Sequence, residues 1–173
     1  MHYCGYIITR KIPTENEIQD ILEPYNEATH DNLKFSWDWF EIGGRYGGKL
    51  KIKFNPDENE DKWFCNSNHD RNFKYFISNK LKELKEELIF YDELECMIYM
   101  GLWENILYVD GAYYKDIYNF DITNTCFVID CDKKLYSREL WINNKWVKDE
   151  KFDEKVKNID LNDKFITVID IHD

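Results

Sequence analysis

The residues best suited to chemistry lie in one stretch, residues 35–54, with the sequence FSWDWFEIGGRYGGKLKIKF. It holds four of the seven glycines, two of the six tryptophans and one of the four arginines. Glycines let backbone N–H groups approach a ligand closely, and an arginine beside them can bind a phosphate or carboxylate through two hydrogen bonds. We therefore expect a ligand site here, and the candidate ligand-binding residues are Trp37, Asp38, Trp39, Gly43, Gly44, Arg45 and Tyr46.

Each candidate side chain suits a part of a nucleotide. The two tryptophans and Tyr46 can stack on a base or sugar, and Asp38 can accept hydrogen bonds from ribose hydroxyls or ring nitrogens. The loop is neither a Walker motif nor a dinucleotide fingerprint, because both of those need a strand, a loop and a helix in succession. The alternative is a structural turn in which Arg45 pairs with a nearby acid such as Asp38 or Glu41.

A second candidate lies at the end of the sequence. Asp170 and His172 are two residues apart, so they share one face of a predicted strand. An aspartate beside a histidine can orient the imidazole for general-base catalysis or can help to bind a metal. The alternative is a solvated end of the chain, and the same spacing arises often by chance. These two residues are the weaker candidates for catalysis.

Composition narrows the classes of function. With 173 residues, 43% hydrophobic and 17% aromatic, the chain can bury a substantial core. The formal net charge of −11 argues against direct binding to nucleic acid or to anionic membranes. No apolar run approaches the roughly 20 residues that span a bilayer, and the first residues lack the pattern of a signal peptide. We expect a cytoplasmic protein.

The cysteines and other nucleophiles show no catalytic or metal-binding pattern. Five cysteines are scattered without a C-x-x-C pair, which predicts neither a disulfide framework nor a zinc site. The G-x-S-x-G turn of hydrolases is missing from the sequence. We predict no metal and no cofactor.

Hydrophobic patterning predicts an α+β fold built on an antiparallel sheet. A helix should begin at a capping box formed by Thr14 and Glu17 and end near Pro24. The strands on either side of Gly43–Gly48 should form a hairpin. The predicted order is a strand at 3–9, a helix at 15–25, strands at 34–42 and 49–54, a helix at 73–88 and a strand at 96–103. This β-α-β-β-α-β order is that of the ferredoxin-like fold, which would occupy residues 1–104.

Residues 105–173 are predicted to form a β-rich extension of the same compact domain. Strands at 106–109 and 112–118 flank Asp110-Gly111, which is a strong hairpin signal. Further strands at 126–130 and 134–142 flank a polar turn, and Asn143-Asn144 turns the chain again. A short helix within 148–158 and a last strand at 165–171 complete the predicted elements.

Residues 37–46, WDWFEIGGRY, resemble a motif, W-D-W-[YF]-x-I-G-G-R-[WY], of small uncharacterised proteins encoded by bacteriophages and by bacteria with mobile elements. Residues 168–172, VIDIH, are similar to the V-[VI]-D-x-H terminus of that group, and residues 126–146 to its acidic turn followed by tryptophan. Tyr46 stands where tryptophan is usual. The resemblance carries over no catalytic role. It implies a phage-type protein in a bacterial host's cytoplasm, with the Arg45 loop near Asp170 and His172.

Three functions follow as hypotheses. The first, which we rank highest, is a binding protein that captures a phosphate-bearing small molecule, such as a nucleotide signal, and counters a host defence. The second is an acidic antagonist that imitates nucleic acid and occupies a basic host protein. The third is a hydrolase in which His172 acts as general base or metal ligand, Asp170 orients it and Arg45 holds an anionic substrate. Self-association through exposed tryptophans is left open.

Overall fold

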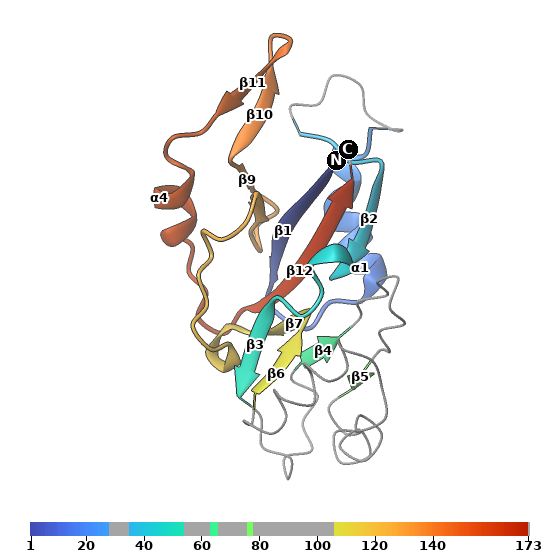
Figure 1. Cartoon of the computed structure of the whole chain (residues 1–173), viewed down its shortest axis with the longest axis vertical. Helices are drawn as coiled ribbons and strands as arrows, with labels where there is room; N and C mark the ends of the chain where they lie inside the picture. The colour runs from blue at the N-terminus through green and yellow to red at the C-terminus, as the bar shows by residue number, and fades with distance from the viewer. Residues whose placement is uncertain (28–34, 54–62, 66–75, 78–105, 173) are drawn as a thin grey trace.

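The computed structural model describes residues 1–27, 35–53, 63–65, 76–77 and 106–172 (Figure 1). The main sheet contains β1 (His2–Thr9), β2 (Trp39–Ile42), β4 (Trp63–Cys65), β5 (Phe76–Ile77), β7 (Gly111–Tyr113), β8 (Phe127–Ile129), β9 (Leu135–Ser137) and β12 (Phe165–His172). Two smaller sheets pair β3 (Leu50–Lys53) with β6 (Ile106–Val109) and β10 (Glu139–Ile142) with β11 (Lys145–Lys148). The described helices are α1 (Glu15–Leu22), α4 (Phe152–Lys157) and the 3₁₀ turns η1 (Glu23–Tyr25), η2 (Gly44–Tyr46) and η5 (Tyr114–Asp116).

The first and last strands form the centre of the main sheet. Its order is β5-β4-β7-β12-β1-β8-β9, with β2 also paired to β12. β1 and β12 are antiparallel over eight residues each, from His2 opposite His172 to Thr9 opposite Phe165. The two ends of the chain therefore meet at one end of the sheet (Figure 1). The α+β class is confirmed, with a core that is mostly sheet.

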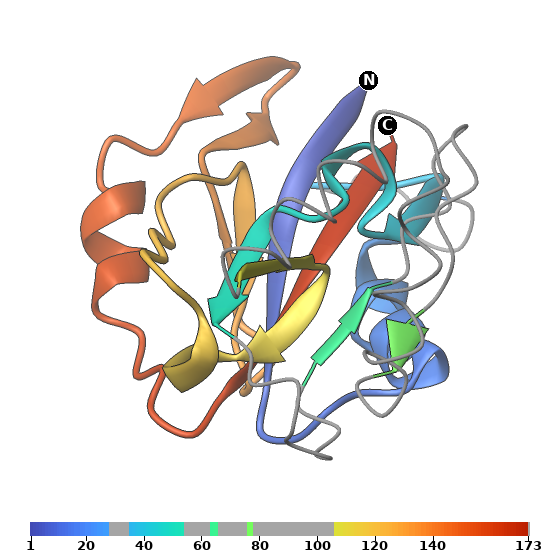
Figure 2. The ribbon, with the colours of Figure 1, turned by 60° about the horizontal axis from the view of Figure 1, so that its bottom comes forward.

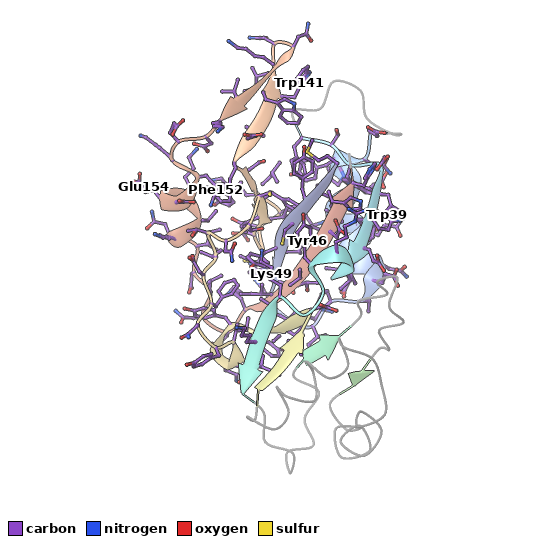
Figure 3. All side chains as sticks on the ribbon, in the orientation of Figure 1. Trp39, Tyr46, Lys49, Trp141, Phe152 and Glu154 are labelled. Atoms are coloured by element: carbon purple, nitrogen blue, oxygen red, sulfur yellow. The ribbon has the colours of Figure 1, made fainter. Side chains whose placement is uncertain are left out.

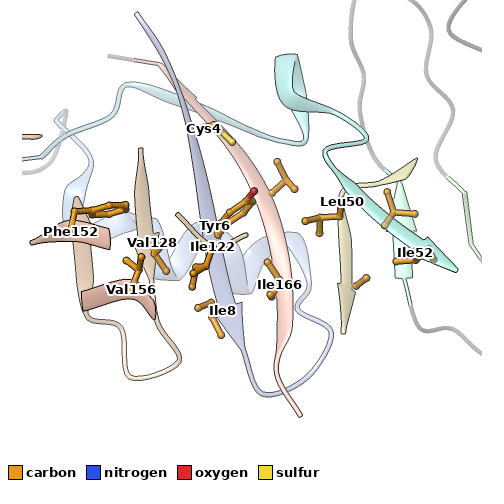
Figure 4. Close-up of a cluster of buried hydrophobic side chains, with 13 residues drawn as sticks. Cys4, Tyr6, Ile8, Leu50, Ile52, Ile122, Val128, Phe152, Val156 and Ile166 are labelled. Carbon is orange, nitrogen blue, oxygen red and sulfur yellow. The ribbon is translucent and has the colours of Figure 1, made fainter. Parts of the chain in front are cut away.

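Alternation along the central strands divides the core between two faces of the sheet, because successive side chains point to opposite sides. On one face, Ile7 and Ile169 pack with Ile18 and Leu22 of α1. Figure 4 shows the other face, where Tyr6, Ile8 and Ile166 lie between β3 and α4. The members that β3 and α4 contribute to this second cluster are Leu50, Ile52, Phe152 and Val156.

Several local predictions are confirmed by hydrogen bonds and backbone angles. The backbone N–H of Glu17 donates to Oγ1 of Thr14 (3.2 Å), and that of Thr14 donates to Oε2 of Glu17 (2.8 Å), so the capping box is present. Asn143 and Asn144 both have positive φ, 53° and 59°, as a tight turn between β10 and β11 requires. The predicted short helix and last strand are α4 and β12.

The predicted hairpin around Gly43–Gly48 is wrong. β2 pairs with β12, and β3 pairs with β6. The connection between β2 and β3 runs from residue 43 to residue 49, which is longer than the two to five or so residues that commonly join hairpin strands. Within it, Gly43 and Gly44 start a 3₁₀ turn that redirects the chain.

The predicted Asp110-Gly111 hairpin is also wrong. β6 pairs with β3, while β7 pairs with β12 and β4. A type I′ turn needs positive φ at both central residues. Neither Asp110 nor Gly111 adopts it, so the chain passes from one sheet to the other at this point.

The ferredoxin-like arrangement is not confirmed. Most of its second predicted helix, 73–88, and its last strand, 96–103, lie outside the described residues. The described pair Phe76–Ile77 is strand β5, so the helix prediction is wrong there. Within the main sheet, strands from 1–104 (β5, β4 and β1) are intermixed with strands from 105–173 (β7, β12, β8 and β9). Among the described helices, none is both long enough and apolar enough to cross a membrane.

Candidate functional site

The candidate site lies where one edge of β12 changes partner. Residues 165–167 pair with β7, and residues 169–172 pair with β2. Val168 lies between these two segments. Its carbonyl accepts a hydrogen bond from the backbone N–H of Gly43 (2.9 Å), and the N–H of Val168 donates to the carbonyl of Asp110 (2.7 Å). The loop at residues 43–48, called the glycine loop below, therefore begins at a fork in the sheet (Figures 1 and 2).

Two buried carboxylates hold the glycine loop against the sheet. Asp110 and Asp170 are both 0% exposed. Oδ2 of Asp170 accepts from the backbone N–H of Arg45 (2.9 Å), and Oδ1 of Asp110 accepts from that of Gly48 (2.6 Å). A buried carboxylate is costly unless donors surround it, and these amides supply them. The same amides are thereby committed to the protein and are not offered to a ligand.

The paired glycines are required by these carboxylates. Gly43 and Gly44 have φ of 75° and 51°, in the region that side-chain-bearing residues rarely adopt. A Cβ atom on Gly43 would lie 2.6 Å from Cγ of Asp110, and one on Gly44 would lie 2.5 Å from Cβ of Asp170. Both glycines thus have a structural role, although the sequence also made them candidates for ligand contact.

Arg45 is the exposed cation of the glycine loop. Its backbone is anchored by Asp170, but its side chain is exposed. The pairing with Asp38 that we considered does not form, because Asp38 bonds His172. Among the described residues, the guanidinium of Arg45 has no hydrogen bond and no ion pair. Its charge is therefore available to an anion.

Two histidines lie beside the loop, each held by a different aspartate. Nδ1 of His2 lies 2.9 Å from Oδ1 of Asp170, and Nδ1 of His172 lies 2.9 Å from Oδ1 of Asp38. The two rings meet edge to face with centroids 5.0 Å apart. A carboxylate can only accept, so Nδ1 of His2 donates and Nε2 remains as a base or acceptor. The expected couple of Asp170 with His172 is thus wrong in detail, since Asp170 holds His2.

Trp39 adds an exposed aromatic surface to this end of the sheet. It lies opposite His172, which lies opposite His2, so the three rings form a row across β2, β12 and β1. Trp39 is 45% exposed, and its ring centroid lies 5.9 Å from that of His2. Figure 3 labels Trp39 on β2 and Tyr46 on η2. This row can stack against a planar ligand.

Two other predicted site residues serve the fold. Trp37 is 5% exposed, and its indole N–H donates to the carbonyl of Leu22 (2.8 Å) within the core. The hydroxyl of Tyr46 donates to the carbonyl of His2 (3.1 Å), which ties the glycine loop to β1. Burial raises the pKa of the Tyr46 phenol. Trp37 and Tyr46 are therefore both less accessible to a ligand than Trp39 is.

Local sequence pattern does not single out His2 or Asp110 as site residues. His2 is isolated in the sequence, and only the pairing of the two end strands brings it to Asp170 and His172. Both end strands are apolar and equal in length, but local sequence pattern does not determine that they pair with each other. Asp110 belongs to a predicted hairpin turn, whereas in the structure it is buried and accepts a hydrogen bond from the backbone N–H of Gly48. Lys49 is a further unpredicted contact, since its Nζ lies 3.2 Å from Sγ of Cys4.

The site has no evident metal centre. Across the described ranges, no group of three or more histidine, cysteine, aspartate or glutamate side chains is arranged to hold a metal ion. No protein-family model, curated protein or solved structure matches this chain.

Proposed function

We propose that this end of the sheet binds a phosphate-bearing small molecule of nucleotide type and sequesters it. The observation that carries the proposal is Arg45, an exposed guanidinium without an ion pair in the described structure, on a loop anchored by a buried carboxylate. A guanidinium matches the geometry of phosphate oxygens and can make two hydrogen bonds to them. The net charge of −11 repels anions, so an exposed cation without an ion pair is what an anion site on this protein requires.

Side chains, and not loop amides, would contact the ligand. The N–H groups of Arg45 and Gly48 already bond Asp170 and Asp110, which leaves the guanidinium as the phosphate ligand. Nε2 of His2 can add a polar contact, since the ring is fixed through Nδ1. The exposed indole of Trp39 provides a surface for a base.

The proposed role against a host defence is based on the resemblance of residues 37–46 and 168–172 to phage-encoded proteins. A protein that holds a nucleotide signal lowers its free concentration, and so weakens a bacterial defence that depends on that signal. The binding needs no reaction and no metal. Its effect depends on the affinity and on the amount of protein made.

Calorimetry with a panel of ligands tests the proposal. The panel contains linear and cyclic mononucleotides and dinucleotides, together with a nucleoside and inorganic phosphate as partial ligands. We expect at least one nucleotide to bind more tightly than either partial ligand, because phosphate and base are recognised together. No heat and no shift in melting temperature with any member would contradict the proposal.

Hydrolysis of the bound molecule is a second candidate function. It is favoured by the two aspartate-held histidines, whose rings lie 5.0 Å apart. A histidine oriented by a buried carboxylate is suited to general-base catalysis. Incubation of the bound nucleotide with stoichiometric protein, followed by phosphorus NMR, distinguishes the two functions. Product that forms with the wild type but not with His2→Gln supports hydrolysis, whereas an unchanged nucleotide supports sequestration alone.

A further inference from the structure

A hollow of about 260 Å³ lies between the β10–β11 hairpin and the main sheet, away from the glycine loop. The residues that matter in its lining are Tyr3, Phe35, Cys126, Arg138, Glu139 and Trp146. Tyr3 follows His2 on β1, so its side chain points to the opposite face of the sheet from the site described above. The hollow is therefore a separate feature of the molecule.

Three aromatic side chains form walls of this hollow. The ring of Phe35 packs against Phe127 with centroids 4.9 Å apart. Trp146 is 48% exposed, and its indole packs against Trp141 with centroids 5.3 Å apart. The hairpin that carries both tryptophans projects from the rest of the chain (Figures 1 and 3). Tyr3, the third wall, is half-buried. Neighbouring rings thus hold two of the walls in place.

The negative charge in the lining comes from Glu139. In the hairpin, Glu139 lies opposite Lys148 and Trp141 lies opposite Trp146, so Glu139 and Trp146 are diagonal neighbours on one face. The carboxylate of Glu139 is exposed, and it has no hydrogen bond or ion pair with the residues that the structure describes. Its negative charge is available to a ligand.

The cation in the lining is already neutralised. Nε of Arg138 donates to the carbonyl of Thr125 (2.8 Å), and Nη2 donates to the carbonyl of Thr123 and pairs with Asp153 (2.7 Å). Its guanidinium lies over the ring of Phe152, 4.5 Å from the centroid. Arg138 is committed to the fold. Glu139 is then the lining carboxylate that a ligand can meet, with Lys148 opposite it on the hairpin.

We propose that this hollow binds an organic ammonium cation of the quaternary or methylated type. Aromatic faces attract such cations through their negative ring quadrupole, and they also bury the methyl groups. The carboxylate of Glu139 adds a charge that a neutral or anionic ligand would not match. A phosphate-bearing ligand would be repelled by Glu139, so this hollow and the Arg45 site select opposite charges.

The test compares choline with 3,3-dimethylbutan-1-ol, a neutral analogue in which carbon replaces the charged nitrogen. Calorimetry should show that choline binds about tenfold more tightly, because cation–π attraction and the carboxylate act on choline alone. Glu139→Gln should lower the affinity for choline about fivefold and leave that for the analogue unchanged. The matched control Glu154→Gln removes an exposed acid of α4 outside the hollow and should have no effect.

Replacement of an aromatic wall gives a second, independent test. Trp146→Leu should weaken the binding of choline, while Tyr114→Leu, at an exposed aromatic residue elsewhere, should not. No binding of choline, equal affinity for the neutral analogue, or unchanged affinity in Glu139→Gln would each overturn the proposal. Because choline carries no phosphate, these outcomes are independent of the nucleotide experiment.

Discussion

The backbone N–H of Arg45 donates to Oδ2 of Asp170 across 2.9 Å, which joins two residues 125 positions apart in the sequence. The other oxygen of the same carboxylate holds Nδ1 of His2 at 2.9 Å. A single buried side chain thus sets the positions of the glycine loop, the first strand and the last strand. The presentation of the Arg45 side chain depends on this connection.

Asp170→Asn should destabilise the protein although it keeps the shape of the side chain. An amide is neutral and has one acceptor oxygen, so both the N–H of Arg45 and that of His2 lose a charged partner, and one of them loses its acceptor. Hydrogen bonds to charged groups contribute about 1.5–3 kcal/mol each, and we expect the free energy of unfolding to fall by about that amount. Urea denaturation measures it, with the exposed Asp160→Asn as control. Equal losses in the two variants would contradict the prediction.

Gly44→Ala should be more destabilising than Gly47→Ala. At Gly44, φ is 51° and a Cβ atom would lie 2.5 Å from Cβ of Asp170. Gly47 is exposed and has φ of −53°, which alanine adopts without strain. The positive φ alone costs about 1 kcal/mol for alanine, and the close contact adds to it. Thermal melting of both variants checks this order, and a reversed order would show that the carboxylate does not constrain the loop.

The two tryptophans of the WDW motif should behave in opposite ways. Trp37→Phe leaves the carbonyl of Leu22 without the indole donor and leaves space in the core, so it should lower the free energy of unfolding by about 1–3 kcal/mol. Trp39→Phe alters an exposed side chain and should change stability by about 0.5 kcal/mol or less. Chemical denaturation compares them. A large loss in Trp39→Phe would show that this ring serves the fold and not a ligand.

Alkaline pH should unfold the protein partly through Tyr6. Burial raises the pKa of its phenol above the ordinary value of 10.0. The stabilisation is complete below the unfolded pKa of 10.0 and is lost as pH rises toward the higher folded pKa, because only the unfolded chain then releases the proton. Burial raises the pKa of the Cys4 thiol as well, so its share of the loss begins above 9.0.

Tyr6→Phe isolates the phenol's contribution. The free energy of unfolding of the wild type should fall by about 1.4 kcal/mol per pH unit for each such group above its unfolded pKa, and the variant should show a shallower decline. Tyr114→Phe removes the hydroxyl of an exposed tyrosine and serves as the control. Parallel pH profiles for the wild type and Tyr6→Phe would contradict this account.

Local features of the fold could be predicted from the sequence because they depend on neighbouring residues. The capping box needs only Thr14 and Glu17, and the turn between β10 and β11 needs only Asn143 and Asn144. The alternation of apolar residues in β12 likewise predicts a strand, although it does not choose its partners. These elements occur in the structure where the sequence places them.

The pairing of distant strands could not be predicted in the same way. Gly43 and Asp110 each suggested a local hairpin, but the two meet at Val168, far from either in the sequence. Asp38, Arg45 and Trp39 were predicted site residues, and the fork in the sheet brings their segment to Asp170 and His172. His2 joins them through β1, a contact that no local signal indicates.

Calorimetry on Arg45→Ala tests the proposed nucleotide site most directly. For the nucleotide that binds the wild type best, Arg45→Ala should weaken binding by about 10- to 100-fold, as expected for the loss of one charged hydrogen-bonding partner. The matched control is Arg10→Ala, which removes another surface arginine that pairs with Asp132 (3.1 Å). Arg10→Ala should bind as the wild type does. Undiminished affinity in Arg45→Ala would contradict a phosphate site at the glycine loop.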